Sequence, residues 1–300
     1  MTMHSSSSQH KQFEIAPKKA NQLNVSSILA WYDELNYIYG YGKKIGIVKD
    51  IIVHGSYGDF TFNNFSDVEL TIFFSSEAEY CNNKAIQSFY RLLNKFILSV
   101  DPLQHHGAFA LGPKTVLSYD AADLPLEAYS NCWSMTGKRI FVKKAFRNSD
   151  CRSIGVKRLR DTVRSLENPD INFFKYGSNL YTQKRFLSNI FMIPTYLLNA
   201  SGEMVSKKDS FSKYKIYNIP NTVQLIDCAS QMRNTWPQKP QNFARARRTY
   251  SQYRMPVGRI DAIVGNFFRN HYVSRGIRQL SEELIPLAIE EIKELNFDNI

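Results

Sequence analysis

Four residues near the start of the chain have types and spacing suited to phosphate and metal chemistry. Gly55 and Ser56 end a short apolar run, and Asp67 and Glu69 follow after a loop rich in turn-forming residues. A glycine lets the backbone approach a ligand closely, and a serine adds a hydroxyl and an N–H for phosphate oxygens. Residues two apart on a strand project from one face, so Asp67 and Glu69 can share hard divalent cations such as Mg²⁺. A pair of such cations can clamp the oxygens of a phosphoryl displacement.

This arrangement resembles the signature of the DNA polymerase β-like nucleotidyltransferase superfamily, and residues 51–74 carry the motif with an apolar strand segment on each side. A looser resemblance, to bacterial aminoglycoside nucleotidyltransferase-like proteins and their minimal relatives with a helical C-terminal domain, extends to residue 211. It rests on Asp101-Pro102-Leu103-Gln104-His105-His106-Gly107, on Leu124-Pro125, on Asn199-Ala200-Ser201-Gly202 and on Lys207-Lys208-Asp209-Ser210-Phe211.

The resemblance implies a magnesium-dependent transfer of a nucleoside monophosphate, usually AMP from ATP, to an acceptor hydroxyl, with pyrophosphate as the leaving group. It implies that Gly55 and Ser56 contact the triphosphate and that Asp67 and Glu69 ligate Mg²⁺ or Mn²⁺. Many members of the family carry Asp where this chain has Glu69, and the longer side chain must shift the metal or be compensated.

The third carboxylate of the family lies on a later strand, where it binds one metal and helps to activate the acceptor hydroxyl. Asp101 is the first choice for this role, because it opens the segment that leads into the next predicted strand. Asp120 and Glu127 are weaker alternatives. His105 and His106 are accessory candidates, either as a base or as a phosphate contact.

Lys157 and Lys208 are the candidates for nucleotide binding outside the motif. Lys157 opens the helical region, and it could reach the triphosphate across a cleft between domains, as could the later pair Lys184-Arg185. A charged outer helix face is the favoured explanation of these residues. Lys207-Lys208 either contacts phosphate or begins a helix, and the sequence leaves both readings open.

Apolar spacing predicts an α+β fold in which a small mixed sheet is followed by an all-helical domain. Residues 1–24 have no apolar periodicity and are interpreted as a disordered tail. Residues 25–148 are the expected nucleotidyltransferase domain, and residues 149–300 are the expected substrate-binding domain. The strands predicted in the first domain are 50–54, 67–74, 107–111 and 138–142, with helices from residue 26 and at 77–99. The helices predicted in the second domain are 154–166, 180–198, 222–235, 241–253, 256–271 and 279–296.

Composition narrows the environment and the partners of the chain. With 300 residues and 43% hydrophobic content the chain can bury a sizeable core. No apolar run of membrane-spanning length occurs, and the four cysteines form no C-x-x-C pair, so we expect no membrane association and a reducing cytoplasm. The net charge of +11 favours anionic partners such as nucleoside triphosphates or RNA.

Two further hypotheses compete with transfer to a small molecule. The basic cluster Arg245–Arg259, with interleaved tyrosines, raises the possibility of an RNA 3′ end or a protein side chain as acceptor. Helical spacing explains the tyrosines as core contacts, so RNA is not the favoured partner. The unfixed third acid leaves open a nucleotide-binding or regulatory module without catalysis. The sequence is compatible with a dimer but does not set the oligomeric state.

Overall fold

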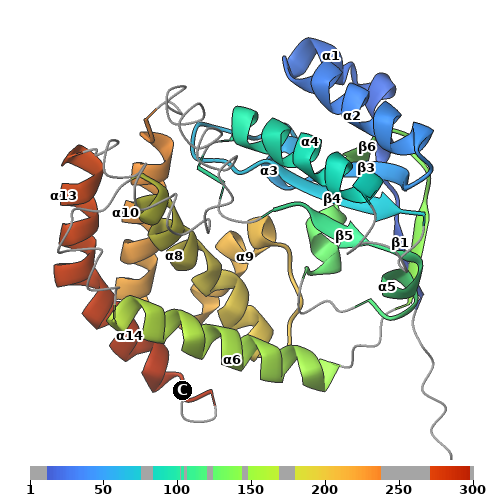
Figure 1. The fold of residues 1–300 in the computed structure, drawn as a ribbon. Helices are drawn as coiled ribbons and strands as arrows, with labels where there is room; N and C mark the ends of the chain where they lie inside the picture. Colours follow the sequence, from blue (N-terminus) through green and yellow to red (C-terminus); the bar gives the residue numbers. More distant parts are fainter. Residues whose placement is uncertain are drawn as a thin grey trace, which may run out of the picture.

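The computed structural model describes residues 12–75, 84–101, 103–104, 107–119, 124–143, 148–168, 180–237 and 271–297. A part with strands and helices runs to Lys143, and a helical part begins at Asn148 (Figure 1). The first part comprises β1 (Gln12–Ile15), β2 (Lys18–Lys19), η1 (Ala20–Leu23), α1 (Val25–Ile28), α2 (Tyr32–Lys44), β3 (Val48–His54), α3 (Gly55–Gly58), β4 (Glu69–Phe74), α4 (Lys84–Val100), β5 (Phe109–Leu111), α5 (Pro113–Leu117), η2 (Leu126–Tyr129), β6 (Trp133–Ser134) and β7 (Ile140–Lys143). The helical part comprises α6 (Asn148–Glu167), α8 (Leu180–Ala200), α9 (Lys207–Lys213), η3 (Tyr214–Tyr217), α10 (Pro220–Asn234), α13 (His271–Gln279), the π-helical turn η4 (Leu280–Leu284) and α14 (Ile285–Glu294).

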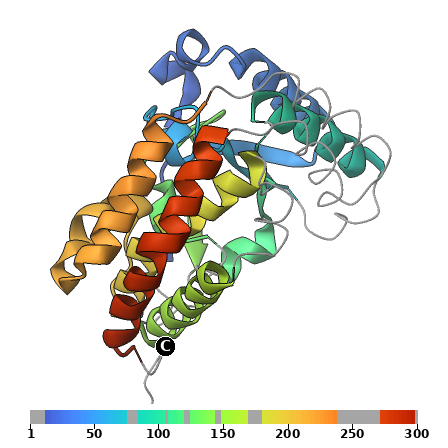
Figure 2. The ribbon, with the colours of Figure 1, turned by 90° about the vertical axis from the view of Figure 1, so that its left-hand side faces the viewer.

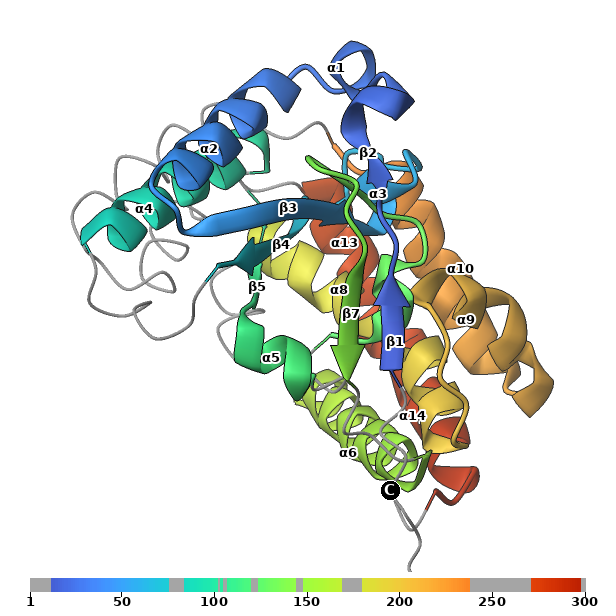
Figure 3. The same ribbon diagram turned by 90° about the vertical axis from the view of Figure 1, so that its right-hand side faces the viewer.

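These elements confirm the mixed α+β class and the small mixed sheet. The main sheet has the order β2-β6-β3-β4-β5, in which β3 and β4 are antiparallel whereas β4 and β5 are parallel. The strand β3 is buried along nearly its whole length, as its run of β-branched residues predicts. A separate antiparallel pair, β1 with β7, crosses beside this sheet (Figure 3).

The two faces of the sheet pack against different neighbours. Ile51, Val53, Leu70 and Ile72 alternate along β3 and β4 toward one face, and they belong to a core that includes residues of α2 and α4. The helical part lies on the opposite side of the sheet from α2 and α4 (Figure 1). Because successive strand residues point to opposite faces, His54 and Glu69 lie on the face turned away from α2 and α4.

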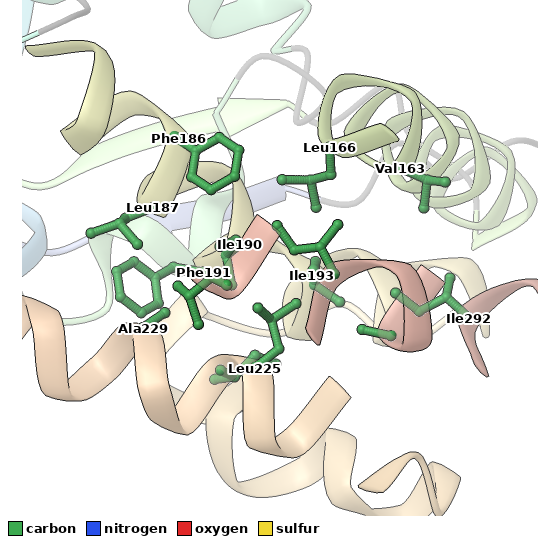
Figure 4. Packing of buried hydrophobic residues seen from close by; sticks show 14 of the residues in the cluster. Val163, Leu166, Phe186, Leu187, Ile190, Phe191, Ile193, Leu225, Ala229 and Ile292 are labelled. Atoms are coloured by element: carbon green, nitrogen blue, oxygen red, sulfur yellow. The ribbon is translucent and has the colours of Figure 1, made fainter. Parts of the chain in front are cut away.

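A second core fills the helical part and reaches into the first part. Helices α6 and α8 pack side by side, and α10 packs against α14 (Figure 2). Figure 4 shows the centre of this core, where Phe191 and Leu225 meet the side chains of neighbouring helices. Phe65 and Leu103 from the first part belong to the same core, and the rings of Phe65 and Trp236 meet edge to face at 5.0 Å. The boundary between the two parts is therefore crossed by shared apolar packing.

The disordered tail predicted for residues 1–24 needs correction, because residues 12–24 form β1, β2, η1 and the residue that follows. Ile15 is only 2% exposed, and β1 is held by its pairing with β7. A four-residue strand is too short to show periodicity, which explains why the sequence did not predict it. Residues 1–11 lie outside the described residues.

Other boundaries also differ from the prediction. The helix expected from residue 26 is divided into α1 and α2, and the one expected over 279–296 spans three segments from α13 to α14. The helix predicted at 241–253 lies outside the described residues, as does that at 256–271 except for His271, which begins α13. None of the described helices has the length and apolar character needed to cross a bilayer.

Replacing Ile15 by Ala tests whether β1 belongs to the fold. Loss of this buried side chain should lower the free energy of unfolding by about 2–4 kcal/mol, measured by chemical denaturation. Glu14→Ala is the matched control, since Glu14 of the same strand forms a surface ion pair with Arg139 at 2.9 Å. That change should cost less than about 1 kcal/mol. Equal and negligible effects of both variants would mean that the segment is a tail.

Candidate functional site

The turn after β3 brings two of the predicted residues into contact. Gly55 has φ +63°, a left-handed conformation that L side chains rarely adopt, and it begins the short helix α3. A Cβ atom at this position would overlap the carboxylate of Glu69. Since His54 and Glu69 are register partners across β3 and β4, the carboxylate lies directly beside the turn. Gly55 is therefore required both by the backbone and by the neighbouring acid.

Glu69 is placed by a polar network under the sheet. His54 is fully buried, and its Nδ1 lies 3.7 Å from Oε2 of Glu69. The other ring nitrogen shares a hydrogen bond of 3.0 Å with the hydroxyl of Thr71, which shares another of 3.0 Å with Tyr129. Burial raises the pKa of Tyr129 to about 12, so this phenol stays protonated. The network fixes the histidine ring that faces Glu69.

Asp67 and Asp101 meet at a single buried cation. The ammonium of Lys184, from α8, is hydrogen-bonded to Oδ1 of Asp67 and lies 3.5 Å from Oδ1 of Asp101. The side chains of Lys184 and Asp101 are fully buried, and that of Asp67 is 13% exposed. The Val68 backbone N–H donates to Oδ2 of Asp101 at 3.1 Å, which holds this acid against the start of β4.

The carboxylates of Asp67 and Asp101 decide the protonation state of Lys184. Burial alone would lower the pKa of Lys184, but the adjacent carboxylates of Asp101 and Asp67 outweigh it and raise the pKa above its ordinary value. Burial and the same two carboxylates raise the pKa of Tyr57, which lies in α3. Lys184 is therefore protonated at neutral pH, and the group carries two carboxylates against one ammonium.

Only two of the three acids that were predicted to bind a metal, Asp67 and Asp101, lie close enough together to share one cation. Asp67 and Asp101 provide hard oxygen ligands that already converge on one cation, which suits Mg²⁺ in chemistry. Glu69 instead directs Oε2 toward His54 and Gly55. Among the described residues, no three His, Cys, Asp or Glu side chains form a group that could hold a metal ion. The carboxylates fit a cation, and in this arrangement Lys184 supplies it.

The remaining predicted residues lie elsewhere. Ser56 is half-buried in α3, beside Gly55. Lys208 is exposed and pairs with Asp59 at 2.9 Å. Lys157 is exposed on α6, and its neighbour Arg158 stands over Tyr196. Tyr196 follows Lys184 by twelve positions on α8, a rise of about 18 Å along the helix, so Lys157 is far from the carboxylates.

Several alternatives cannot be placed or do not join the site. His105, His106, Asp120 and the Arg245–Arg259 cluster lie outside the described residues. Glu127 lies in η2, and β5 carries no carboxylate among its three residues. Asp101, which precedes β5 and follows α4, is the acid that reaches the group.

The sequence prediction did not identify Lys184 as a buried residue of the site. Lys184 had been interpreted as part of a charged outer helix face. Leu180 lies four positions before it and Leu187 three positions after it, and both are buried. A lysine on an apolar helical stripe is the signal that could have identified it, because a buried ammonium requires a partner.

No protein-family model matches the chain, and neither a curated protein nor a solved structure does. The resemblance to nucleotidyltransferases therefore remains a prediction from sequence motifs. The features that bear on function are the carboxylates of Asp67 and Asp101, the ammonium of Lys184 and the turn at Gly55.

Gly55→Ala should lower the free energy of unfolding by more than Gly46→Ala. Both glycines have a positive φ, but an added Cβ at Gly46 meets nothing within 4 Å. Gly46→Ala should cost about 1–2 kcal/mol from backbone strain alone. Gly55→Ala adds the overlap with Glu69, so it should lower the free energy of unfolding further. The double variant with Glu69→Ala should regain part of this additional loss. Chemical denaturation of the single and double variants measures it, and equal costs for the two glycines would contradict the contact.

Lys184→Met should destabilise the fold by about 3–5 kcal/mol at neutral pH, because two carboxylates lose their buried counter-charge. The raised pKa of Lys184 means that its contribution is complete below its ordinary value of 10.5 and is lost as pH rises through the higher folded value. The difference between wild type and variant should therefore narrow above pH 10.5. Denaturation curves across the alkaline range measure this difference, and a constant one would contradict the assigned pairing.

Proposed function

We propose that this chain is a divalent-cation-dependent nucleotidyltransferase, which moves a nucleoside monophosphate from a triphosphate to an acceptor hydroxyl and releases pyrophosphate. ATP is the expected donor. The observation that supports this most strongly is the convergence of Asp67 and Asp101 on one buried cation. The turn at Gly55 lies beside Glu69 on the same edge of the sheet. Two acids from distant segments and a close-approach glycine are the parts that phosphoryl transfer requires.

Asp67 and Asp101 would hold Mg²⁺ or Mn²⁺, which would neutralise part of the phosphate charge, whereas Glu69 is turned toward His54. Lys184 and a divalent cation are alternative partners of Asp67 and Asp101, because a single position between the two acids is already filled. Binding of a metal by both acids at this position would displace the ammonium of Lys184 from Oδ1 of Asp67. The released ammonium of Lys184, if it lay beside a triphosphate, would balance part of the negative charge of the phosphates.

The other residues of the site would position rather than react. Gly55 keeps the turn open, so that the backbone N–H groups near Ser56 can approach phosphate oxygens. Asp101 is fully buried and held by Val68, which favours a role in holding the cation over direct contact with the acceptor. His54 restrains Glu69 from below the sheet. Catalysis would come mainly from orientation and charge neutralisation.

A nucleotide-binding or regulatory module without turnover is the second candidate function. The observation that favours it is that the fully buried ammonium of Lys184 already pairs with both acids. Calorimetry that detects nucleotide binding, combined with no turnover in either Mg²⁺ or Mn²⁺, would select this function. RNA or a protein is the alternative acceptor, and the basic cluster that motivates it lies outside the described residues.

The test of transfer is magnesium-dependent release of pyrophosphate from ATP with small-molecule, RNA and protein acceptors. Asp67→Asn should reduce the rate by at least about 100-fold, because an amide is a poor substitute for a charged ligand. Asp59→Asn is the control, since Asp59 pairs with exposed Lys208 and lies outside the carboxylate group. An Asp67→Asn enzyme as active as wild type would rule out the proposed site.

A further inference from the structure

Two cations from different helices stand over the same buried ring. Lys207 begins α9, and its Nζ lies 5.7 Å from the centre of the Phe191 ring. Arg233 lies in the last turn of α10, and its Cζ is 5.8 Å from the same centre. Phe191 is 1% exposed and belongs to the core of the helical part. We call these residues the Lys207–Arg233 pair.

The guanidinium of Arg233 has a donor that none of the described residues satisfies. Its Nε is buried and has no hydrogen-bond partner in the described part of the chain. Burial lowers the pKa of Arg233, yet a guanidinium remains protonated at any ordinary pH. A buried charged donor without an acceptor is costly, and it indicates that the site normally meets a water or an anion.

Lys207 adds a second positive charge to this place. As a residue it is exposed, whereas its ammonium stands over a core ring, where burial lowers its pKa. The ring contact places the ammonium against the core, although the residue as a whole is exposed. The charges of Arg233 and Lys184 also lower the pKa, while those of Glu69 and Asp67 raise it. The Phe191 ring under the pair lies 5.7 Å from the Phe65 ring between centroids, and the ammonium of Lys184 lies 5.7 Å from the Phe65 centroid, so the Lys207–Arg233 pair adjoins the carboxylate group.

Neither cation forms an ion pair within the part of the chain that the structure describes. The contrast with the next residue is direct, because Lys208 turns to Asp59 and pairs at 2.9 Å. Two neighbouring like charges repel each other unless an anion lies between them. A ligand for this place must therefore carry several negative oxygens, and the planar guanidinium suits phosphate in particular.

We infer that Lys207 and Arg233 bind the polyphosphate end of a nucleoside triphosphate. This inference rests on the proposed function, and it names the residues of the helical part that receive the phosphates. The carboxylates of Asp67 and Glu69 lie on the sheet side of the same site, so the phosphates would lie between acids and cations. Lys208, which the sequence predicts to bind nucleotide, is paired with Asp59 instead.

Calorimetric titration with sodium tripolyphosphate, in EDTA to remove metals, tests the pair without any need for turnover. Wild type should bind, and Lys207→Gln and Arg233→Gln should each bind at least about ten-fold more weakly, as expected for loss of a charged hydrogen bond. Lys213→Gln should bind as wild type does, since Lys213 lies on the same helix and pairs at the surface with Glu203. Lys207 is exposed, so its variant should fold even if Arg233→Gln does not.

The outcomes separate this inference from the proposed function. Weakened tripolyphosphate binding in Lys207→Gln, with Lys213→Gln unchanged, supports the pair even if no nucleotidyl transfer is ever detected. Unchanged affinity in both Lys207→Gln and Arg233→Gln, or no binding by wild type, overturns the pair even if transfer is observed. A matching loss in Lys213→Gln would show attraction by net charge alone and would also overturn it.

Discussion

The ammonium of Lys184, buried between Asp67 and Asp101, is the contact on which the arrangement of the site depends. Removing a charge from water costs several kcal/mol, and only well-placed opposite charges offset that cost. The helix α8 must therefore bring its lysine to a defined point beside β4. A buried group of this kind is weak evidence for net stability, but it restricts how the helical part can sit against the sheet.

The neighbouring packing follows from the same placement. Phe191 lies two turns further along α8, where it contacts the edge of Phe65 from the loop that precedes Asp67. That loop therefore packs Phe65 into the core of the helical part and pairs Asp67 with the buried Lys184. The carboxylates and the cations consequently face each other where the two parts meet, which is where proteins commonly bind small ligands.

The predictable features are those encoded by local pattern. The strands around residues 51–74 were expected from their apolar, β-branched runs, and Asp101 was chosen from its position before β5. The strand β1 was missed because four residues carry too little periodicity. The role of Lys184 could not be derived from charge alone, because a basic residue on a helix usually faces solvent. Its partner Asp67 is remote in sequence, and only tertiary packing brings the two together.

The most direct test is a crystal structure of the protein soaked with Mn²⁺ and a non-hydrolysable nucleoside triphosphate. Anomalous scattering would locate the metal independently of any assay for an acceptor. The proposed site predicts a Mn²⁺ peak bound by Asp67 and Asp101, with the Lys184 ammonium displaced from Asp67 toward the phosphates. A bound nucleotide with no metal at these acids, and with Lys184 still bonded to Asp67, would contradict nucleotidyl transfer at this site.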